Sequence, residues 1–304
     1  MIPTSYSYSR YLEAKASVDA RALHPRVWSA FVDRLAKTGG TVSILEVGGG
    51  VGVTVQRVIE ALTARPVDRV AYTMIDQRAE NISRARDRLP AWAAEQGFEV
   101  DGTETKYVFR HPDLDVAVRL VTGDAFAAEV HERDVYDAII AQAVLDVVPL
   151  HRAFQVFRER SHEQTLWYLP IHFNGVTAFE PVVNASLDTQ IERAYHASMY
   201  TNDEEDRGGP HTGRRLLSAI CEEGRHIAEA GGSDWIVTSD EDHNYTQEES
   251  YFLHHILHFI ESELEDSSAV SSDAFQDWAH RRHQQVEDGV LTYIAHNIDV
   301  LAAP

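Results

Sequence analysis

The residues best suited to chemistry form a glycine-rich stretch that follows an apolar run. Residues 42–52 read Val-Ser-Ile-Leu-Glu-Val-Gly-Gly-Gly-Val-Gly. A helical pattern comes next, with its apolar positions on one stripe at Val51, Val55, Val58, Ile59 and Leu62. Glycines between a strand and a helix permit positive φ angles and let a ligand approach the backbone closely. This order of strand, glycine turn and helix predicts a site for a nucleotide-like ligand.

The spacing of the glycines indicates which kind of nucleotide site this is. The dinucleotide pattern G-x-G-x-x-G, begun at Gly48, requires glycine where the chain has Val53, and begun at Gly50 it requires glycine where the chain has Val55. The stretch fits G-x-G-x-G instead, with Glu46 two residues before the first glycine. A dinucleotide cofactor is therefore disfavoured.

Two more carboxylates follow the next predicted strands. Asp76 ends the second strand, where a doubly wound sheet places it beside the glycine turn and where it could accept hydrogen bonds from both hydroxyls of a ribose. A helix N-cap is the alternative for such an aspartate. Asp124 lies in the segment Gly-Asp-Ala-Phe at 123–126, after the third strand, where an ordinary turn is the alternative.

In this order, the three segments resemble motifs of the class I S-adenosylmethionine-dependent methyltransferases that act on small molecules. The resemblance covers roughly residues 40–170 and implies S-adenosyl-L-methionine as the cofactor. It implies that Asp124 accepts from the adenine amino group while Phe126 offers an apolar wall. The cofactor-binding residues that it implies are Glu46, Gly48, Gly50, Gly52, Asp76, Gln77, Gly123, Asp124, Ala125, Phe126, Ala141 and Gln142.

The segment after the fourth strand, residues 136–148, resembles the part of these enzymes that faces the methionine moiety. Asp146 in this segment is one catalytic candidate, and His172, after the fifth strand at the carboxyl edge of the sheet, is the other. The segment lacks the Asn/Asp-Pro-Pro-aromatic motif of DNA amino-methylating enzymes, and Cys221 follows Ile220 rather than a proline. Both nucleic-acid subclasses are therefore disfavoured.

Such an enzyme needs no nucleophile of its own, because a sulfonium already carries an activated methyl group. The protein has to align donor and acceptor and to supply a base where the acceptor is protonated. Two other functions stay open at this point. An aminopropyltransferase-like enzyme uses the same fold, and a non-catalytic S-adenosylmethionine-binding protein would explain the long C-terminal half.

The net charge and the cysteine content limit the kinds of binding partner and the compartment that are expected for this chain. The chain has 27 Lys+Arg against 48 Asp+Glu, a formal charge of −21, which repels phosphate backbones and anionic membranes. We expect a small-molecule substrate, no nucleic acid and no membrane, and a homodimer is compatible with the sequence. The single Cys221 and the lack of an apolar leader favour the cytoplasm. His254 and His258 lack the Glu of H-E-x-x-H, so no metal site is predicted.

The elements that must position these residues alternate between strand and helix. After the first strand, apolar runs predict strands at 70–75, 116–121, 138–141 and 166–169, and helical patterns lie around 79–89 and 150–160. A hairpin is predicted between Phe98 and Phe109, with its turn at Asp101-Gly102. The fold class is therefore α/β, a doubly wound, mostly parallel sheet with helices on both faces, plus helical N-terminal and C-terminal additions.

Outside this core the predictions are coarser. The N-terminal helices, with Tyr8, Arg10 and Tyr11, could fold over the cofactor, a sixth strand is expected at 235–237, and helices are expected at 252–264 and 290–301. The acidic loop 201–210 is interpreted as a lid or a solvated connection. The predicted segments are a helical lead-in (1–40), a cofactor-binding core (41–172), a cap over the substrate site (173–215), and the last core helix and strand with C-terminal helices (216–304).

Overall fold

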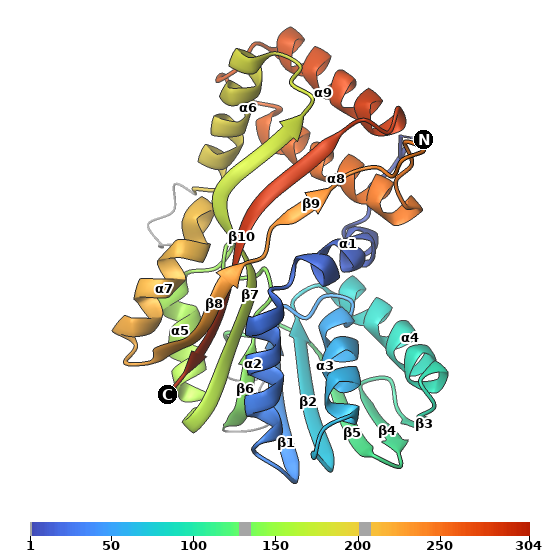
Figure 1. The fold of residues 1–304 in the computed structure, drawn as a ribbon, viewed down its shortest axis with the longest axis vertical. Coiled ribbons are helices and arrows are strands. Elements are labelled where there is room, and N and C mark those ends of the chain that lie inside the picture. The colour runs from blue at the N-terminus through green and yellow to red at the C-terminus, as the bar shows by residue number, and fades with distance from the viewer. Residues whose placement is uncertain (1, 128–134, 201–207) are drawn as a thin grey trace.

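The computed structural model describes residues 2–127, 135–200 and 208–304 (Figure 1). Its helices are α1 (Tyr8–Ala22), α2 (Pro25–Ala36), α3 (Val53–Thr63), α4 (Ala79–Glu95), α5 (Leu150–Glu159), α6 (Ala185–Ser198), α7 (Thr212–Glu222), α8 (Gln247–Leu264) and α9 (Ser272–Glu287), with a short 3-10 turn η2 (Gly209–His211). Its strands are β1 (Thr41–Val47), β2 (Arg69–Asp76), β3 (Glu99–Gly102), β4 (Lys106–His111), β5 (Leu114–Thr122), β6 (Tyr136–Ile140), β7 (Ser161–Glu180), β8 (His226–Gly232), β9 (Trp235–Val237) and β10 (Thr292–Ala303).

The described strands form one sheet in the order β3-β4-β5-β2-β1-β6-β7-β10-β8, and β9 pairs with β10. The five strands β5, β2, β1, β6 and β7 run parallel to one another. Strand β10 is antiparallel to both β7 and β8. The order reverses between β1 and β6, the switch point at which doubly wound sheets bind ligands. The predicted fold class is confirmed.

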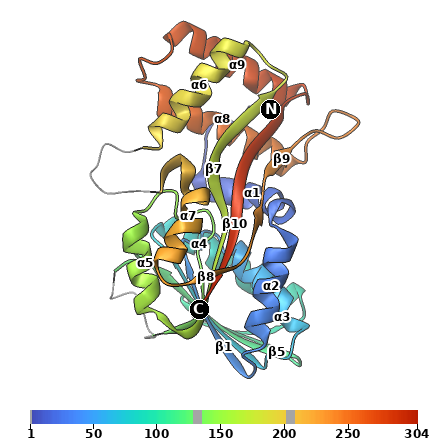
Figure 2. The same ribbon diagram turned by 60° about the vertical axis from the view of Figure 1, so that its left-hand side comes forward.

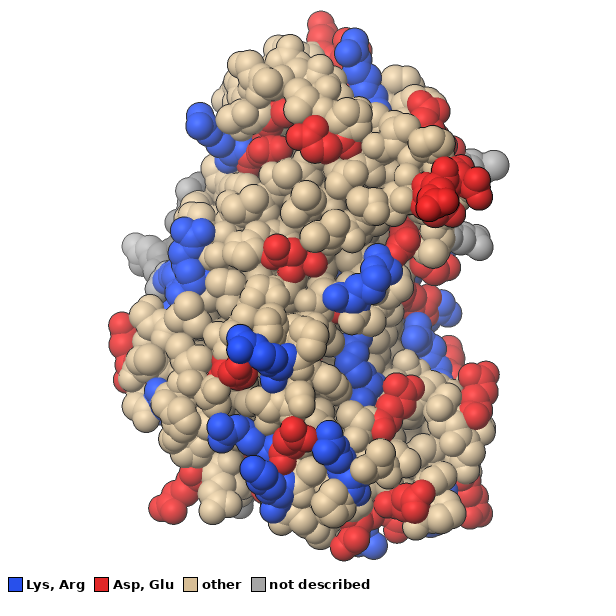
Figure 3. Space-filling view, viewed as in Figure 1, with Lys and Arg blue, Asp and Glu red and all other residues tan. Residues whose placement is uncertain are grey.

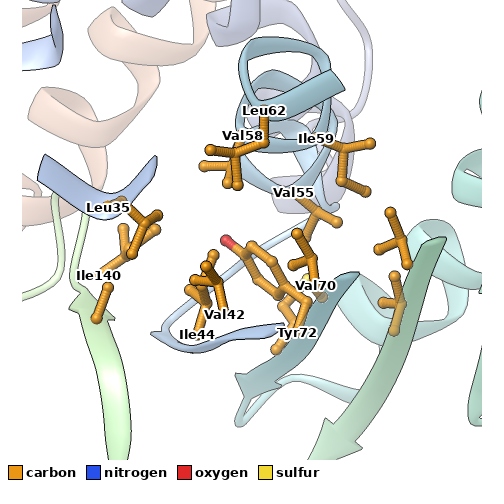
Figure 4. Packing of buried hydrophobic residues seen from close by; sticks show 14 of the residues in the cluster. Leu35, Val42, Ile44, Val55, Val58, Ile59, Leu62, Val70, Tyr72 and Ile140 are labelled. Atoms are coloured by element: carbon orange, nitrogen blue, oxygen red, sulfur yellow. The ribbon is translucent and has the colours of Figure 1, made fainter. Parts of the chain in front are cut away.

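Helices cover the two faces of the sheet, and each face has its own core. One core joins α2, α3 and α4 to the sheet, and the other joins α5 and α7 to the opposite face. Figure 4 shows the first of these, where Val55 and Ile59 of α3 pack over Val70 and Tyr72 of β2. All four side chains are almost fully buried, so the predicted apolar stripe of α3 fixes the helix that follows the glycine turn.

Beyond its carboxyl edge the sheet continues into a second lobe. Strand β7 has 20 residues, far more than the predicted run at 166–169, and its upper half rises with β10 toward α6, α8 and α9 (Figures 1 and 2). We call this upper half of β7 and β10, together with β9, α6, α8 and α9, the second lobe. His172 and Asn174 thus lie within β7 rather than after it.

Two predictions about the C-terminal part are wrong. The segment predicted as a helix at 290–301 belongs to strand β10. Buried positions alternate along most of this strand and include the polar Asn297 and Asp299. Its apolar residues fall at helical spacing by coincidence. The sixth core strand is β8 rather than 235–237, which is β9 at the side of β10. Strand β10 runs antiparallel to β7 and lies between β7 and β8 in the sheet.

Smaller differences concern loops. The hairpin of β3 and β4 is present, but Gly102 pairs with Tyr107, so the turn falls after the predicted Asp101-Gly102. Of the predicted acidic loop at 201–210, residues 201–207 lie outside the described part of the chain.

Candidate cofactor and acceptor site

The predicted cofactor residues of the first two motifs meet at the carboxyl ends of β1 and β2. The amides of Gly48 and Gly49 donate to the carbonyl of Ile75, at 2.9 and 3.1 Å, so the glycine turn is clamped onto the end of β2. Gly48 has φ +69°, and a Cβ there would stand 2.8 Å from Cγ2 of Val144. Both the backbone conformation and the close approach therefore require glycine at this position.

The buried side chain of Glu46 supports the glycine turn from behind and does not form its surface. Its side chain is buried, and the Tyr72 hydroxyl donates to its Oε2 at 2.9 Å. Burial raises the pKa of Glu46 to about 7, against the opposing effect of hydrogen bonds from Tyr72 and Thr54. The same Oε2 would be 3.1 Å from a Cβ at Gly49, so Glu46 packs directly behind the turn.

Asp76 links the turn to the helix that follows β2. Its Oδ2 accepts from the Gly50 amide at 2.9 Å, and its Oδ1 accepts from the Arg78 amide at 2.8 Å and from Asn81 Nδ2 at 3.1 Å. The carboxylate thus stands against the glycine turn, as a ribose-binding acid must. Asp76 does not occupy the N-cap position of α4, which is Arg78, although its carboxylate accepts from the amide of that residue. Gln77, next in the chain, is exposed.

The adenine motif lies farther along the same edge. Asp124 Oδ1 accepts from the Phe126 amide at 2.9 Å, and Oδ2 pairs with Arg152 of α5 at 2.7 Å. The Arg152 guanidinium lies 5.7 Å from the centre of the Phe126 ring. A hollow of about 220 Å³ opens between Phe126 and the α5 residues Gln155 and Glu159. Asp124 is therefore engaged with α5, while Phe126 keeps one side open.

The segment after β6 is strained and carries the first catalytic candidate. Ala143, which is not a glycine, has φ 51°, and its amide donates to the Pro170 carbonyl at 3.1 Å. Such strain is common at functional sites. Asp146 follows, and its Oδ1 is shielded from solvent and accepts no hydrogen bond from the described residues. Burial raises the pKa of Asp146 to about 7, offset in part by hydrogen bonds from Thr212 and from the Phe173 amide.

Two adjacent residues that the resemblance implies for cofactor binding, Ala141 and Gln142, make different contacts. Ala141 is fully buried, and its amide donates to the Tyr168 carbonyl at 3.1 Å. Gln142 reaches toward the glycine turn, where its Oε1 accepts from the Thr54 hydroxyl at 3.3 Å. Gln142 therefore connects the end of β6 to the start of α3.

His172, the other catalytic candidate, is enclosed in β7. The side chain has no exposed surface, and neither ring nitrogen bonds a described residue. Burial lowers the pKa of His172 to about 3, which leaves a neutral imidazole at physiological pH. Asn174 lies two residues farther and accepts from Arg214 Nε at 2.6 Å, so Arg214 is engaged with β7.

Sequence reasoning missed the residues that α1 contributes. Helix α1 packs against the glycine turn, since Leu12 Cδ1 lies 3.0 Å from where a Cβ of Gly50 would be, whereas Tyr11 stacks on Phe252 of α8. Lys15 and Asp19, on the same side of α1, are both buried and form an ion pair. Charged residues four apart usually indicate a solvated helix surface, so only the structure could reveal that this pair is enclosed.

The two histidines compared with a metal motif do not converge. His254 Nδ1 lies 2.7 Å from His283 Nδ1, whereas His258 stacks on Tyr6 at 4.1 Å. Within the described ranges no group of three or more His, Cys, Asp or Glu could hold a metal ion.

No helix in the described part of the chain has both the length and the apolar character to cross a membrane. Acidic and basic side chains are interspersed on the face shown in Figure 3.

Comparisons with known proteins give distant similarities only. No family model matches this chain, and no curated protein matches it. An S-adenosylmethionine-dependent methyltransferase from Thiobacillus denitrificans, solved with S-adenosyl-L-homocysteine, is 10% identical with a TM-score of 0.44 over 93% of both chains. Geranyl diphosphate C-methyltransferase from Streptomyces coelicolor A3(2) is 12% identical with a TM-score of 0.42, over 90% of this chain and 75% of that one.

A third structure, YjhP from E. coli, is 12% identical with a TM-score of 0.45, over 97% of this chain and 99% of that one. These similarities are too distant to carry an assignment of function. The assignment rests on the chain's own residues.

Proposed function

We propose that this chain is an S-adenosylmethionine-dependent methyltransferase that transfers a methyl group to a small-molecule acceptor. One observation carries the proposal. The carboxylate of Asp76, at the end of β2, is hydrogen-bonded to the amide of Gly50 in the glycine turn, at the switch point of a doubly wound sheet. An acid in that position can accept from ribose hydroxyls beside a turn that admits close ligand approach.

The residues present suit this cofactor. Asp76 retains one acceptor site, on Oδ2, because each carboxylate oxygen offers two lone pairs and the three protein donors occupy both sites of Oδ1 and one of Oδ2. Phe126 borders the hollow beside α5, and Asp146 offers an unpartnered oxygen near the end of β6. In this proposal the ribose contacts Asp76, the adenine lies near Asp124 and Phe126, and the methionine moiety lies near Gln142.

When bound, the cofactor supplies an electrophilic methyl group on a sulfonium. The chain's own residues then orient the acceptor and handle its proton. Asp146 is the better supported base, because a pKa near 7 lets its carboxylate exist and accept a proton at neutral pH. His172, with a pKa near 3, holds a proton only weakly, and it stays a prediction of lower rank.

The chemistry of the chain favours a small acceptor in a reducing compartment. The formal charge of −21 opposes nucleic-acid binding, and a gel shift at low salt, where screening is weakest, is the strictest test of that part. The single cysteine, Cys221, cannot form an internal disulfide, which suits the cytoplasm. Sedimentation at several protein concentrations decides between a monomer and a homodimer.

Calorimetric titration of the purified chain tests the proposal. We expect binding of S-adenosylmethionine and of S-adenosylhomocysteine, and no binding of NAD at equal concentration. Failure to bind either sulfur compound would refute the proposal. Preferential binding of decarboxylated S-adenosylmethionine would favour aminopropyl transfer. Binding with no release of S-adenosylhomocysteine in the presence of cell extract would favour a non-catalytic binding protein.

A further inference from the structure

Helix α1 forms one wall of the candidate cofactor site. Leu12 lies on the glycine turn, as described above, and the first turn of α1 is tied to α4. Ser9 Oγ donates to Glu80 Oε1 at 2.5 Å, and Arg84 of α4 pairs with Glu13 at 2.9 Å. Because α1 is fixed at its start, the residues that follow Leu12 on the same side are held over the carboxyl edge of the sheet.

Those residues are Lys15 and Asp19, three and seven positions after Leu12. Their exposed fractions are 6% and 3%, and Nζ of Lys15 lies 2.5 Å from Oδ2 of Asp19. A buried ion pair loses the hydration of both charges and is a weak source of stability. An enclosed pair of this kind beside a predicted ligand site points to a role in binding.

The partners of Asp19 place the pair at the switch point. Gln142 Nε2, directly after β6, donates to Oδ2 at 2.8 Å, and Trp235 Nε1 of β9 donates to Oδ1 at 2.9 Å. Gln142 in turn accepts from Thr54, just beyond the glycine turn, at 3.3 Å. The pair is therefore bonded directly to the segment after β6 and, through Gln142, to Thr54 at the start of α3.

Lys15 has hydrogen-bonding capacity that the protein leaves unused. An ammonium carries three N–H groups, and among the described residues only Asp19 accepts from Lys15. The ring of Trp235 lies 5.3 Å away and offers only its face. The positive charge of Lys15 also acts on Asp146, whose pKa it lowers slightly against the effect of burial. A buried cation with free donors is suited to an anionic ligand group.

We propose that the Lys15–Asp19 pair receives the α-amino-acid end of the cofactor. Lys15 binds the α-carboxylate, and Asp19, which retains one lone-pair site, binds the α-ammonium. The two charges of the pair thus match the two charges of the zwitterion. This inference rests on the proposed function, and it adds the residues that distinguish a cofactor with an amino-acid end from one without it.

Two ligands separate this role from general effects on binding. S-adenosylhomocysteine carries the amino-acid end, whereas 5′-methylthioadenosine has the same nucleoside and sulfur without it. Calorimetric titration gives the affinity ratio of these two ligands for the parent, for Lys15→Met and for Asp19→Asn. Lys37→Met is the matched control, because Lys37 is exposed on the far end of α2.

Loss of a hydrogen bond to a charged group predicts that Lys15→Met weakens S-adenosylhomocysteine by about tenfold or more. Affinity for 5′-methylthioadenosine should stay within about twofold of the parent, since that ligand makes no contact with the pair. Asp19→Asn should shift the ratio in the same direction, and Lys37→Met should leave it unchanged.

An affinity ratio of the two ligands that stays at the parental value in Lys15→Met would overturn the inference. If the KM for the acceptor changed while this ratio did not, the pair would serve the acceptor, and the inference would also be overturned. A parent that binds neither ligand would instead refute the proposed function. If Lys15→Met melts early because Asp19 is left with its charge, the double variant Lys15→Met/Asp19→Asn removes both charges and the same ratio decides.

Discussion

Replacing Asp76 with alanine tests whether its carboxylate binds the cofactor or only the protein. The carboxylate is 7% exposed and accepts from Gly50, Arg78 and Asn81. Alanine would leave the Gly50 amide and the Asn81 side chain without their acceptor, whereas the amide of the exposed Arg78 can turn to water. We therefore expect two effects, a loss of stability from the protein contacts and a loss of affinity from the ribose contacts.

The two effects differ in size and in readout. Hydrogen bonds to a charged group contribute about 1.5–3 kcal/mol each, so losing two of them should lower the unfolding free energy by roughly 3–6 kcal/mol. At about 2–4 °C per kcal/mol this lowers Tm by roughly 6–24 °C. If a ribose hydroxyl also loses its acceptor on Oδ2, the Kd for S-adenosylhomocysteine should rise by roughly tenfold or more.

Asn81→Ala is the control, because it removes one partner of Asp76 and leaves the carboxylate in place. It should lower the unfolding free energy by about 1 kcal/mol and change the Kd by less than about threefold. Asn is a poor replacement for Asp76 itself, since its amide NH2 must face either Gly50 N–H or the donors of Arg78 and Asn81.

Thermal melts and calorimetric titrations of the same three proteins separate the contributions. The ribose assignment requires Asp76→Ala to bind more weakly than Asn81→Ala at a temperature where both are folded. An Asp76→Ala protein that melts early but binds S-adenosylhomocysteine like the parent would refute it. Asp76 would then only hold the glycine turn and the start of α4 in place.

Two further predictions concern pH. Burial raises the pKa of Asp146 from 3.8 to about 7, so the folded state holds a proton that the unfolded state has released, and Asp146 lowers stability as pH rises from about 4 to 7. Asp146→Asn should therefore gain in Tm over the parent at pH 8 relative to pH 5, and an equal difference at both would contradict the burial argument. His172 acts in the opposite sense, because burial lowers its pKa from 6.5 to about 3 and stability is lost as pH falls below about 6.5, by up to ~1.4 kcal/mol per pH unit. His172→Phe should flatten this acid side of the melting profile, and an unchanged profile would show that His172 accepts a proton without unfolding.

The cofactor half was predictable because its signals are local. Apolar runs of strand length, the glycines of the turn and the order of Asp76 and Gly123 each depend on a few adjacent residues, and parallel strands covered on both faces are apolar along their whole length. The structure places β1, β2, β5 and β6 within a few residues of their predicted bounds, whereas β7 extends well beyond its predicted run.

The C-terminal half was harder to predict because polar residues are buried in it. Asn297 donates through Nδ2 to the carbonyl of Ser233, and Asp299 accepts from the amides of His24 and Ile171. These partners are distant in sequence, so they leave no periodic signal. Because polar residues of β10 face inward, its sequence lacks the alternation of apolar and polar residues that identifies a strand. The spacing of Ile294 and Ile298 then resembles that of a helix.

Helix α6 was missed for a different reason. Its polar and aromatic composition favours no clear face, yet Asn184 caps it by accepting from the amides of Ser186 and Leu187. The cap was a readable signal. The enclosure of Lys15 and Asp19 was not, because it depends on β9 and on the end of β6, which the chain reaches far downstream of α1.

The contacts of α1 join the two lobes. Asp19 accepts from Gln142 at the end of β6 and from Trp235 in the second lobe, and α1 also packs its Tyr11 against Phe252 of α8 at 5.7 Å. One helix thus touches the glycine turn, the segment with the proposed base, and the apolar core of the second lobe. A ligand group that bonds to Lys15 and Asp19 adds to contacts on which both lobes depend. Cofactor binding is therefore expected to stabilise α1 and the second lobe together, in addition to the Rossmann-like half that carries the recognisable motifs.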